Sequence, residues 1–79
     1  MVYKLVVPPT ADGNLNITVL KWIKKTGDPV VKGEDIVEAK TEKITLYVTA
    51  PTNGILVEIL VPVGAKAKVN DELGSIEGS

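Results

Sequence analysis

The chain has 79 residues and a mass of 8.4 kDa, which is enough for one small domain and too little for a substrate pocket with its own catalytic machinery. It contains no Cys, His or Arg, which excludes disulfides, thiolate zinc sites, thiol nucleophiles, imidazole bases and guanidinium clamps. Nine Lys against ten acidic residues give a net charge of −1, so no nucleic acid partner is expected.

Short apolar runs separated by Gly, Pro, Asn and Asp are typical of β-strands, and no segment has the sustained period of a helix. We predict strands, in chain order, over residues 2–7, 16–25, 35–40, 44–49, 55–61 and 73–76. Because the only aromatic residues are Tyr3, Trp22 and Tyr47, the core must be aliphatic. No segment approaches the roughly 20 apolar residues of a membrane helix, so no membrane partner is expected.

The two halves of the chain resemble each other when the sequence is shifted by 37 residues. The shift places residues 19–23 on residues 56–60 and Gly27 on Gly64. The identities are few, so a chance similarity between two β-rich halves stays open. A true repeat predicts an all-β fold, a sandwich or flattened barrel with approximate twofold symmetry in which both halves contribute to one core.

A hairpin is predicted between the two halves, with Glu42 and Lys43 at the centre of its turn. The turn contains no Gly, Asn or Pro, and a type I turn, which needs no positive φ, is compatible with its residues. Such a turn projects Lys43 into solvent at one end of the domain. The predicted symmetry brings the two chain termini together at the other end.

Three elements follow one another with a characteristic spacing. Residues 21–34 contain a strand, a Gly-Asp turn and a Val-Lys-Gly stretch, followed by the triplet Thr41-Glu42-Lys43 and then by Ala50-Pro51 and Gly54. Over nearly the whole chain this order resembles the lipoyl and biotinyl attachment domains of 2-oxoacid dehydrogenase complexes and related multienzyme systems. The resemblance implies a single domain over residues 1–79 with that family's fold, a barrel-sandwich hybrid of two antiparallel sheets with quasi-twofold symmetry.

The resemblance implies that lipoate is attached through an amide to the side chain of Lys43, because the triplet corresponds to the family's Thr-Asp-Lys. A second amine, Lys40, stands where the family usually has Glu. The spacing from Ala50-Pro51 selects Lys43, whereas Lys40 falls within the strand that leads to the turn. The expected flanking recognition residues are Thr41, Glu42 and Ile44.

Biotin is the alternative cofactor, because the lipoyl and biotinyl branches share one fold. Biotinyl domains flank their lysine with methionines, whereas the only Met of this chain is Met1, so the triplet favours lipoate. A biotin carboxyl carrier and an unmodified β module that binds a partner are the competing functions. We expect no catalytic residues, since no nucleophile–base pair can be assembled here, and no metal site.

As a lipoyl domain, the chain is expected to be modified by a lipoate ligase or lipoyl transferase and to be monomeric in isolation. The resemblance implies reductive acylation at a thiamine-diphosphate decarboxylase, acyl transfer at an acyltransferase core and reoxidation by dihydrolipoamide dehydrogenase, in a 2-oxoacid or acetoin dehydrogenase complex. The loop expected to recognise these partners, by analogy with the family, comprises Thr10, Ala11, Asp12, Gly13 and Asn14; a solvated turn without a partner is the alternative.

The resemblance also carries expectations about the chain's context. We expect this domain to be the N-terminal part of a longer acyltransferase whose catalytic core lies elsewhere, so that the isolated domain is not an enzyme. The expected location is the bacterial or archaeal cytoplasm, or the mitochondrial matrix in a eukaryote.

Overall fold

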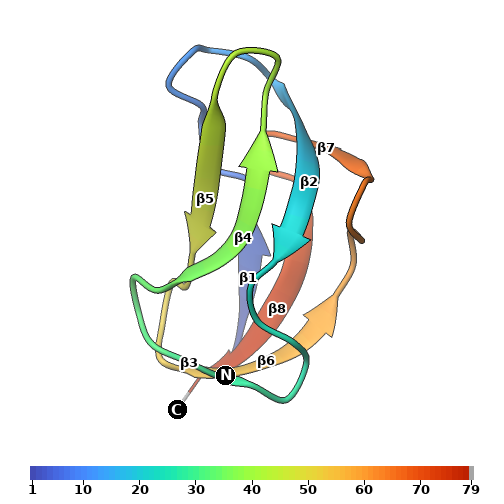
Figure 1. Ribbon diagram of the computed structural model, residues 1–79. Coiled ribbons are helices and arrows are strands. Elements are labelled where there is room, and N and C mark those ends of the chain that lie inside the picture. Colours follow the sequence, from blue (N-terminus) through green and yellow to red (C-terminus); the bar gives the residue numbers. More distant parts are fainter. Residues whose placement is uncertain (79) are drawn as a thin grey trace.

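The computed structural model describes residues 1–78 and consists of β-strands joined by turns (Figure 1). In chain order the strands are β1 (Val2–Val6), β2 (Asn16–Trp22), β3 (Pro29–Val30), β4 (Asp35–Lys40), β5 (Thr45–Thr49), β6 (Gly54–Ile59), β7 (Lys66–Lys68) and β8 (Glu72–Gly78). The domain predicted over residues 1–79 is thus described up to Gly78, and Ser79 lies outside the described residues. Residues 1–78 form no helix, and hence none long and apolar enough to cross a membrane.

Two antiparallel sheets of four strands form the predicted flattened barrel or sandwich. One sheet has the order β1-β8-β6-β3 and the other has the order β5-β4-β2-β7. Exchanging β1 with β5, β8 with β4, β6 with β2 and β3 with β7 converts one order into the other. This exchange is the predicted twofold symmetry, and the predicted fold class is confirmed.

The shift of 37 residues holds for the backbone contacts as well as for the strand order. The N–H of Gly27 donates to the carbonyl of Leu56 at 2.7 Å, and the N–H of Gly64 donates to the carbonyl of Val19 at 2.8 Å. Strands β2 and β6 also contain a β-bulge at equivalent positions. The repeat is therefore structural, and each half is completed by hydrogen bonds from the other.

The structure contains two strands that the sequence pattern does not predict. One of them, β3, begins at Pro29, and a proline is tolerated there because β3 lies at the edge of its sheet. The other unpredicted strand, β7, is also an edge strand. Strands of two and three residues are too short to show an alternating apolar pattern.

Five of the six predicted strands have boundaries that differ from the observed ones, and for two of them, predicted over residues 2–7 and 44–49, the difference is a single residue. The strand predicted over residues 16–25 ends at Trp22, the strand predicted over residues 55–61 ends at Ile59, and the strand predicted over residues 73–76 spans Glu72–Gly78. The last strand is extended because it pairs on both sides, with β1 and with β6. Pairing to two neighbours thus decides strand length where the apolar pattern is weak.

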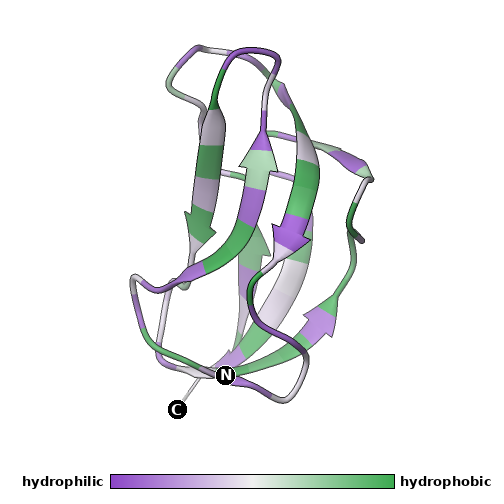
Figure 2. Ribbon diagram, in the orientation of Figure 1, coloured by the Kyte–Doolittle hydropathy of each residue, from purple (hydrophilic) through white to green (hydrophobic). Residues whose placement is uncertain are grey.

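The core between the sheets is aliphatic, as predicted. The buried hydrophobic residues are Leu5, Val7, Ile17, Val19, Val30, Ile36, Val37, Ala39, Val48, Ala50, Leu56, Ala67, Leu73 and Ile76. Hydrophobic and hydrophilic residues alternate along β2, β4 and β5 (Figure 2), so one side of each strand faces the core. Trp22 is half-buried at the margin of the core, where its Nε1–H donates to the carbonyl of Val61 at 2.8 Å.

The predicted hairpin turn and the chain termini lie at opposite ends of an elongated molecule of 35 × 20 × 17 Å (Figure 1). The N-terminal ammonium of Met1 is 3.3 Å from Oε1 of Glu77, near the other end of the chain. At the opposite end, the turn between β4 and β5 lies beside the loop between β1 and β2. The arrangement predicted from the repeat is therefore confirmed.

Candidate functional site

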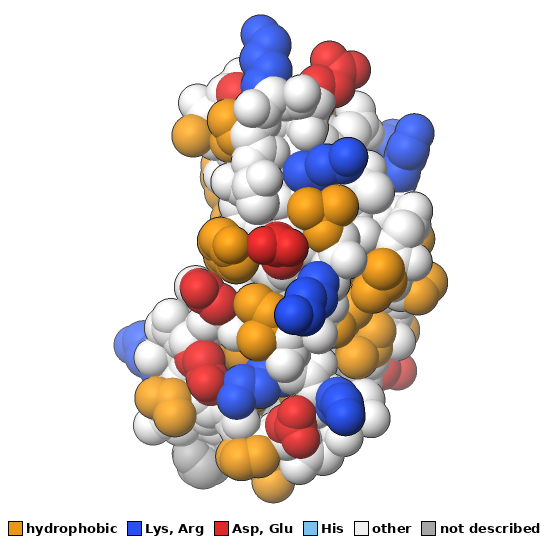
Figure 3. Space-filling model, in the orientation of Figure 1, with side chains coloured by type: hydrophobic (Ala, Val, Ile, Leu, Met, Phe, Trp, Pro, Cys, Tyr) orange, Lys and Arg blue, Asp and Glu red, His pale blue; other side chains and the backbone are white. Residues whose placement is uncertain are grey.

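The turn between β4 and β5 presents Lys43 at one end of the molecule. The N–H of Thr41 donates to the carbonyl of Ile44 at 2.9 Å and closes the turn, while Glu42 and Lys43 between them are exposed. Neither Glu42 nor Lys43 has a positive φ, which fits a turn without Gly or Asn. Figure 3 shows basic and acidic side chains projecting from this end of the molecule.

Thr41 holds the turn from its inner side, because its side chain is only 7% exposed. The Thr41 hydroxyl donates to Oδ2 of Asp12 at 2.7 Å and accepts hydrogen bonds from the N–H groups of Lys43 and Ile44, both at 3.1 Å. A hydroxyl has one donor proton and two acceptor lone pairs, and this geometry uses all three. The backbone of Lys43 is therefore fixed, whereas its side chain is free to extend into solvent.

The loop predicted to recognise partners is joined to the turn through Asp12. Within the loop, Oγ1 of Thr10 donates to the carbonyl of Asn14 at 2.6 Å, and the N–H of Asn14 donates to Oδ1 of Asp12 at 3.1 Å. One carboxylate oxygen thus organises the loop and the other binds Thr41. These donated hydrogen bonds, first from Thr41 and then from Asn14, hold the pKa of the Asp12 carboxyl below its ordinary value.

The structure brings the two predicted sets of residues together at one end of the molecule. In the loop, Ala11 and Gly13 are exposed, and Gly13 has a φ of 74° that suits glycine. In the turn, Ile44 is half-buried. Lys40, the second amine near the turn, is the last residue of β4 and pairs with Thr45 of β5, so its side chain stands on a sheet face and not on the turn.

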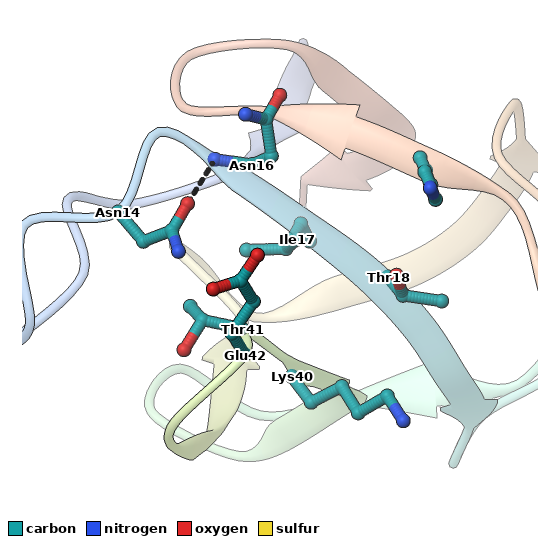
Figure 4. A pocket seen from close by; sticks show the side chains of 8 residues that line it. Asn14, Asn16, Ile17, Thr18, Lys40, Thr41 and Glu42 are labelled. Atoms are coloured by element: carbon teal, nitrogen blue, oxygen red, sulfur yellow. Dashed lines mark hydrogen bonds between the residues drawn. The ribbon is translucent and has the colours of Figure 1, made fainter.

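A groove of about 610 Å³ beside the turn is a feature that the sequence does not reveal. It is lined by Asn14, Asn16, Ile17, Thr18, Lys40, Thr41, Glu42 and Lys66. In Figure 4, Glu42 points toward Ile17 and Asn14, while Lys40 extends along the other side of the groove. The lining residues come from three strands and two turns, and only strand pairing brings them together.

Known proteins include relatives that are similar to this chain in sequence. A family described as "Biotin-requiring enzyme", in the biotin and lipoyl class, matches residues 5–76. The dihydrolipoyllysine-residue succinyltransferase component of the 2-oxoglutarate dehydrogenase complex from Rickettsia felis is 41% identical over 76 residues, which cover 96% of this chain and 19% of that protein. The chain thus spans about a fifth of the length of the curated relatives that it matches.

Solved structures show the same fold. The solution structure of the lipoyl domain of the 2-oxoglutarate dehydrogenase complex from Azotobacter vinelandii matches with a TM-score of 0.74 and 30% identity, covering 96% of this chain and 98% of that one. A single-chain, multi-domain long-chain acyl-CoA carboxylase matches with a TM-score of 0.83 over 99% of this chain and 7% of that one. At 20% identity, the second match shows the fold alone.

Proposed function

The chain belongs to the family of biotinyl and lipoyl attachment domains, and we propose that within it the chain is a lipoyl carrier domain with lipoate on Lys43. The observation that carries the proposal is the geometry of the β4–β5 turn. The Lys43 side chain is exposed at the end of the molecule, while its N–H is held by the buried Thr41 hydroxyl at 3.1 Å. A modifying enzyme can reach the amine, and the scaffold keeps it in one place.

Attachment asks little of the chain beyond an accessible amine. The unprotonated Nζ of Lys43 attacks the activated carboxyl carbon of lipoate, the activating group leaves, and the nitrogen loses a proton as the amide forms. Among residues 1–78 the ion pairs join Met1 to Glu77 and Lys24 to Glu34, so no carboxylate pairs with Lys43. The amide removes the lysine charge and lengthens the flexible side chain.

Lipoate is favoured over biotin by the residues next to the lysine. The triplet Thr41-Glu42-Lys43 has the form of a lipoyl site, and the methionines expected beside a biotinylated lysine are absent from it. The 30% identity to a lipoyl domain over nearly its full length supports the same choice. A biotin carboxyl carrier is the second candidate, because the matching family is described as "Biotin-requiring enzyme" and covers biotinyl as well as lipoyl domains.

The relatives suggest the setting in which the arm works. We infer from these relatives that the domain belongs to the acyltransferase component of a 2-oxoglutarate dehydrogenase complex, with the catalytic core outside this chain. The proposed location stays the bacterial or archaeal cytoplasm, or the mitochondrial matrix in a eukaryote. The arm would receive an acyl group at the decarboxylase, pass it to coenzyme A at the acyltransferase and be reoxidised by dihydrolipoamide dehydrogenase. Tethering raises the effective concentration of the acyl group at each of these partners.

The test is intact-mass measurement after incubation with a lipoate ligase, ATP and lipoate. The chain should gain the mass of one lipoyl group, Lys43→Ala should gain nothing, and Lys40→Ala should be modified like the parent chain. Modification of Lys43→Ala would show that another amine is the site. A parallel incubation with a biotin ligase, read by streptavidin binding, separates the second candidate from the first.

A further inference from the structure

Two lysines and a threonine form a row across the outer face of one sheet. Thr18 of β2 pairs with Lys40 of β4 on one side and with Lys66 of β7 on the other. Directly paired residues face the same side of a sheet, with Cβ atoms about 5 Å apart. The hydroxyl of Thr18 therefore lies between two ammonium-bearing side chains, and all three residues line the groove beside the attachment turn. Figure 4 labels Thr18 and Lys40.

Neither ammonium group in this row is neutralised by a carboxylate. The ion pairs formed by residues 1–78 involve Met1, Glu77, Lys24 and Glu34, and not Lys40 or Lys66. Lys40 and Lys66 lie on β4 and β7, which flank β2, so their like charges repel each other across one strand, and an anion bound between them relieves this repulsion. One acidic residue, Glu42, also lines the groove, but it stands at the turn and points toward Ile17 and Asn14 (Figure 4). The groove is thus cationic on its sheet side.

We propose that the row Lys40–Thr18–Lys66 binds the free carboxylate of a dicarboxylic acyl group, such as succinyl, carried on the arm of this same domain. The inference rests on the proposed attachment of lipoate to Lys43. Two ammonium groups and a hydroxyl supply donors to a carboxylate, and a neutral acyl group such as acetyl offers nothing for them to bind. The site therefore distinguishes acyl groups by their charge.

Position and size both suit this occupant. Glu42, the residue before Lys43, itself lines the groove, so the arm begins at the edge of the groove. The volume of about 610 Å³ lies within the range of roughly 300–1,000 Å³ that is typical of small-molecule sites. The groove is open to solvent, so the carboxylate binds weakly and salt should weaken it further. Weak binding suits a carrier, which must release its acyl group to the next enzyme.

The test compares two chemically modified lipoyl arms, one that ends in a charged group and one that ends in a neutral group of similar size. The lipoylated, 15N-labelled chain is reduced, and its dihydrolipoyl thiols are alkylated with iodoacetate or with iodoacetamide, which gives thioethers ending in a carboxylate or in a neutral amide. Each thiol loses its proton and displaces iodide, and because the chain contains no Cys, only the arm supplies thiols. We expect the amide resonances of Thr18, Lys40 and Lys66 to differ between the two products more than those of other residues outside the turn.

Variants assign this difference to the two lysines. Lys40→Gln and Lys66→Gln should each reduce the difference at Thr18 at least twofold, and 1 M salt should suppress it in the parent chain. Lys68→Gln is the matched control, because Lys68 lies on the same strand, is exposed and does not line the groove. It should keep the difference. Equal spectra for the two products, or an equal loss in Lys68→Gln, would overturn the proposal.

Two further measurements distinguish the proposed site from a site for free anions, and its failure from a failure of the proposed function. Free succinate at the same molar concentration should leave the spectrum of the unlipoylated chain unchanged; an equal response there would assign the row to free anions and reject an arm-borne occupant. The mass of the starting material reports lipoylation at Lys43 independently. Failed lipoylation would defeat the proposed function, whereas successful lipoylation with equal spectra would defeat only the carboxylate site.

Discussion

At the scale of single residues, Thr41 and Asp12 connect two surfaces that the sequence presents as separate. Thr41 is part of the attachment triplet and Asp12 is part of the loop expected to recognise partners, yet their side chains are hydrogen-bonded at 2.7 Å. The same Thr41 hydroxyl holds the N–H of Lys43. A change in the loop is therefore expected to alter the position of the lysine even when no partner is present.

This connection predicts a dependence on pH. Because hydrogen bonds to its ionised form lower the pKa of Asp12, the contact adds stability above the ordinary pKa of an Asp and loses it as the pH falls through the lowered value. NMR titration of the Asp12 carboxyl carbon should give a midpoint below that of an unperturbed Asp. Thr41→Val should raise this midpoint and reduce the free energy of unfolding by about 1 kcal/mol. An unchanged midpoint in Thr41→Val would show that the hydrogen bond is not formed in solution.

At the scale of elements, the repeated turns need one special backbone conformation in each half. Gly33 has a φ of 86°, and Asn70, its counterpart 37 residues later, has a φ of 75°. The N–H of Gly33 donates to the carbonyl of Ala50, and the N–H of Asn70 donates to the carbonyl of Val7, both at 2.9 Å. The second half thus uses Asn, a residue that tolerates this conformation, where the first half uses Gly.

A pair of substitutions at Asn70 tests this requirement. Asn70→Ala should lower the free energy of unfolding by about 1 kcal/mol, because a side chain with a Cβ and no local hydrogen bond is strained at positive φ. Asn70→Gly should stay within about 0.5 kcal/mol of the parent, since relief of strain offsets the greater freedom of glycine in the unfolded chain. Urea unfolding measures both values. A larger loss for Gly than for Ala would contradict the assigned backbone conformation.

At the scale of the whole molecule, the two halves are not separate units. The N–H groups of Gly27 and Gly64 each donate to a strand of the other half. In addition, β3 of the first half pairs with β6 of the second half in one sheet. Ile36 and Leu73, which occupy equivalent positions, are both fully buried in one core. The domain is therefore expected to unfold in one cooperative transition, although its sequence is a repeat.

Conservative substitutions in each half test this cooperativity. Ile36→Val and Leu73→Val should each lower the free energy of unfolding by about 1 kcal/mol, a loss small enough for the variants to remain folded. In both variants, the midpoint of urea unfolding should fall, and it should fall by the same amount whether it is followed by Trp22 fluorescence or by far-UV circular dichroism. If Leu73→Val lowered the unfolding midpoint measured by dichroism but not the one measured by fluorescence, the two halves would unfold separately.

The fold was largely predictable because its signals are local or repeated. The long strands β2, β4, β5 and β6 follow from alternating apolar residues, and the symmetry follows from the 37-residue shift. The edge strands β3 and β7 were not predictable, because two or three residues carry no pattern and their pairing partners lie far along the chain. Of the candidate site, the turn with its exposed Lys43 was predictable, and the groove was not.

By itself, the sequence determined the all-β class, the aliphatic core, the lack of Cys, His and Arg, and the central turn that displays one lysine, since these depend on composition and near-neighbour order. Only the tertiary structure decided that Asp12 holds Thr41 and that Lys40 and Lys66 flank Thr18. Such contacts depend on which strands pair and in which register. Strand register is set by the packing of the whole core, and no local stretch of sequence encodes it.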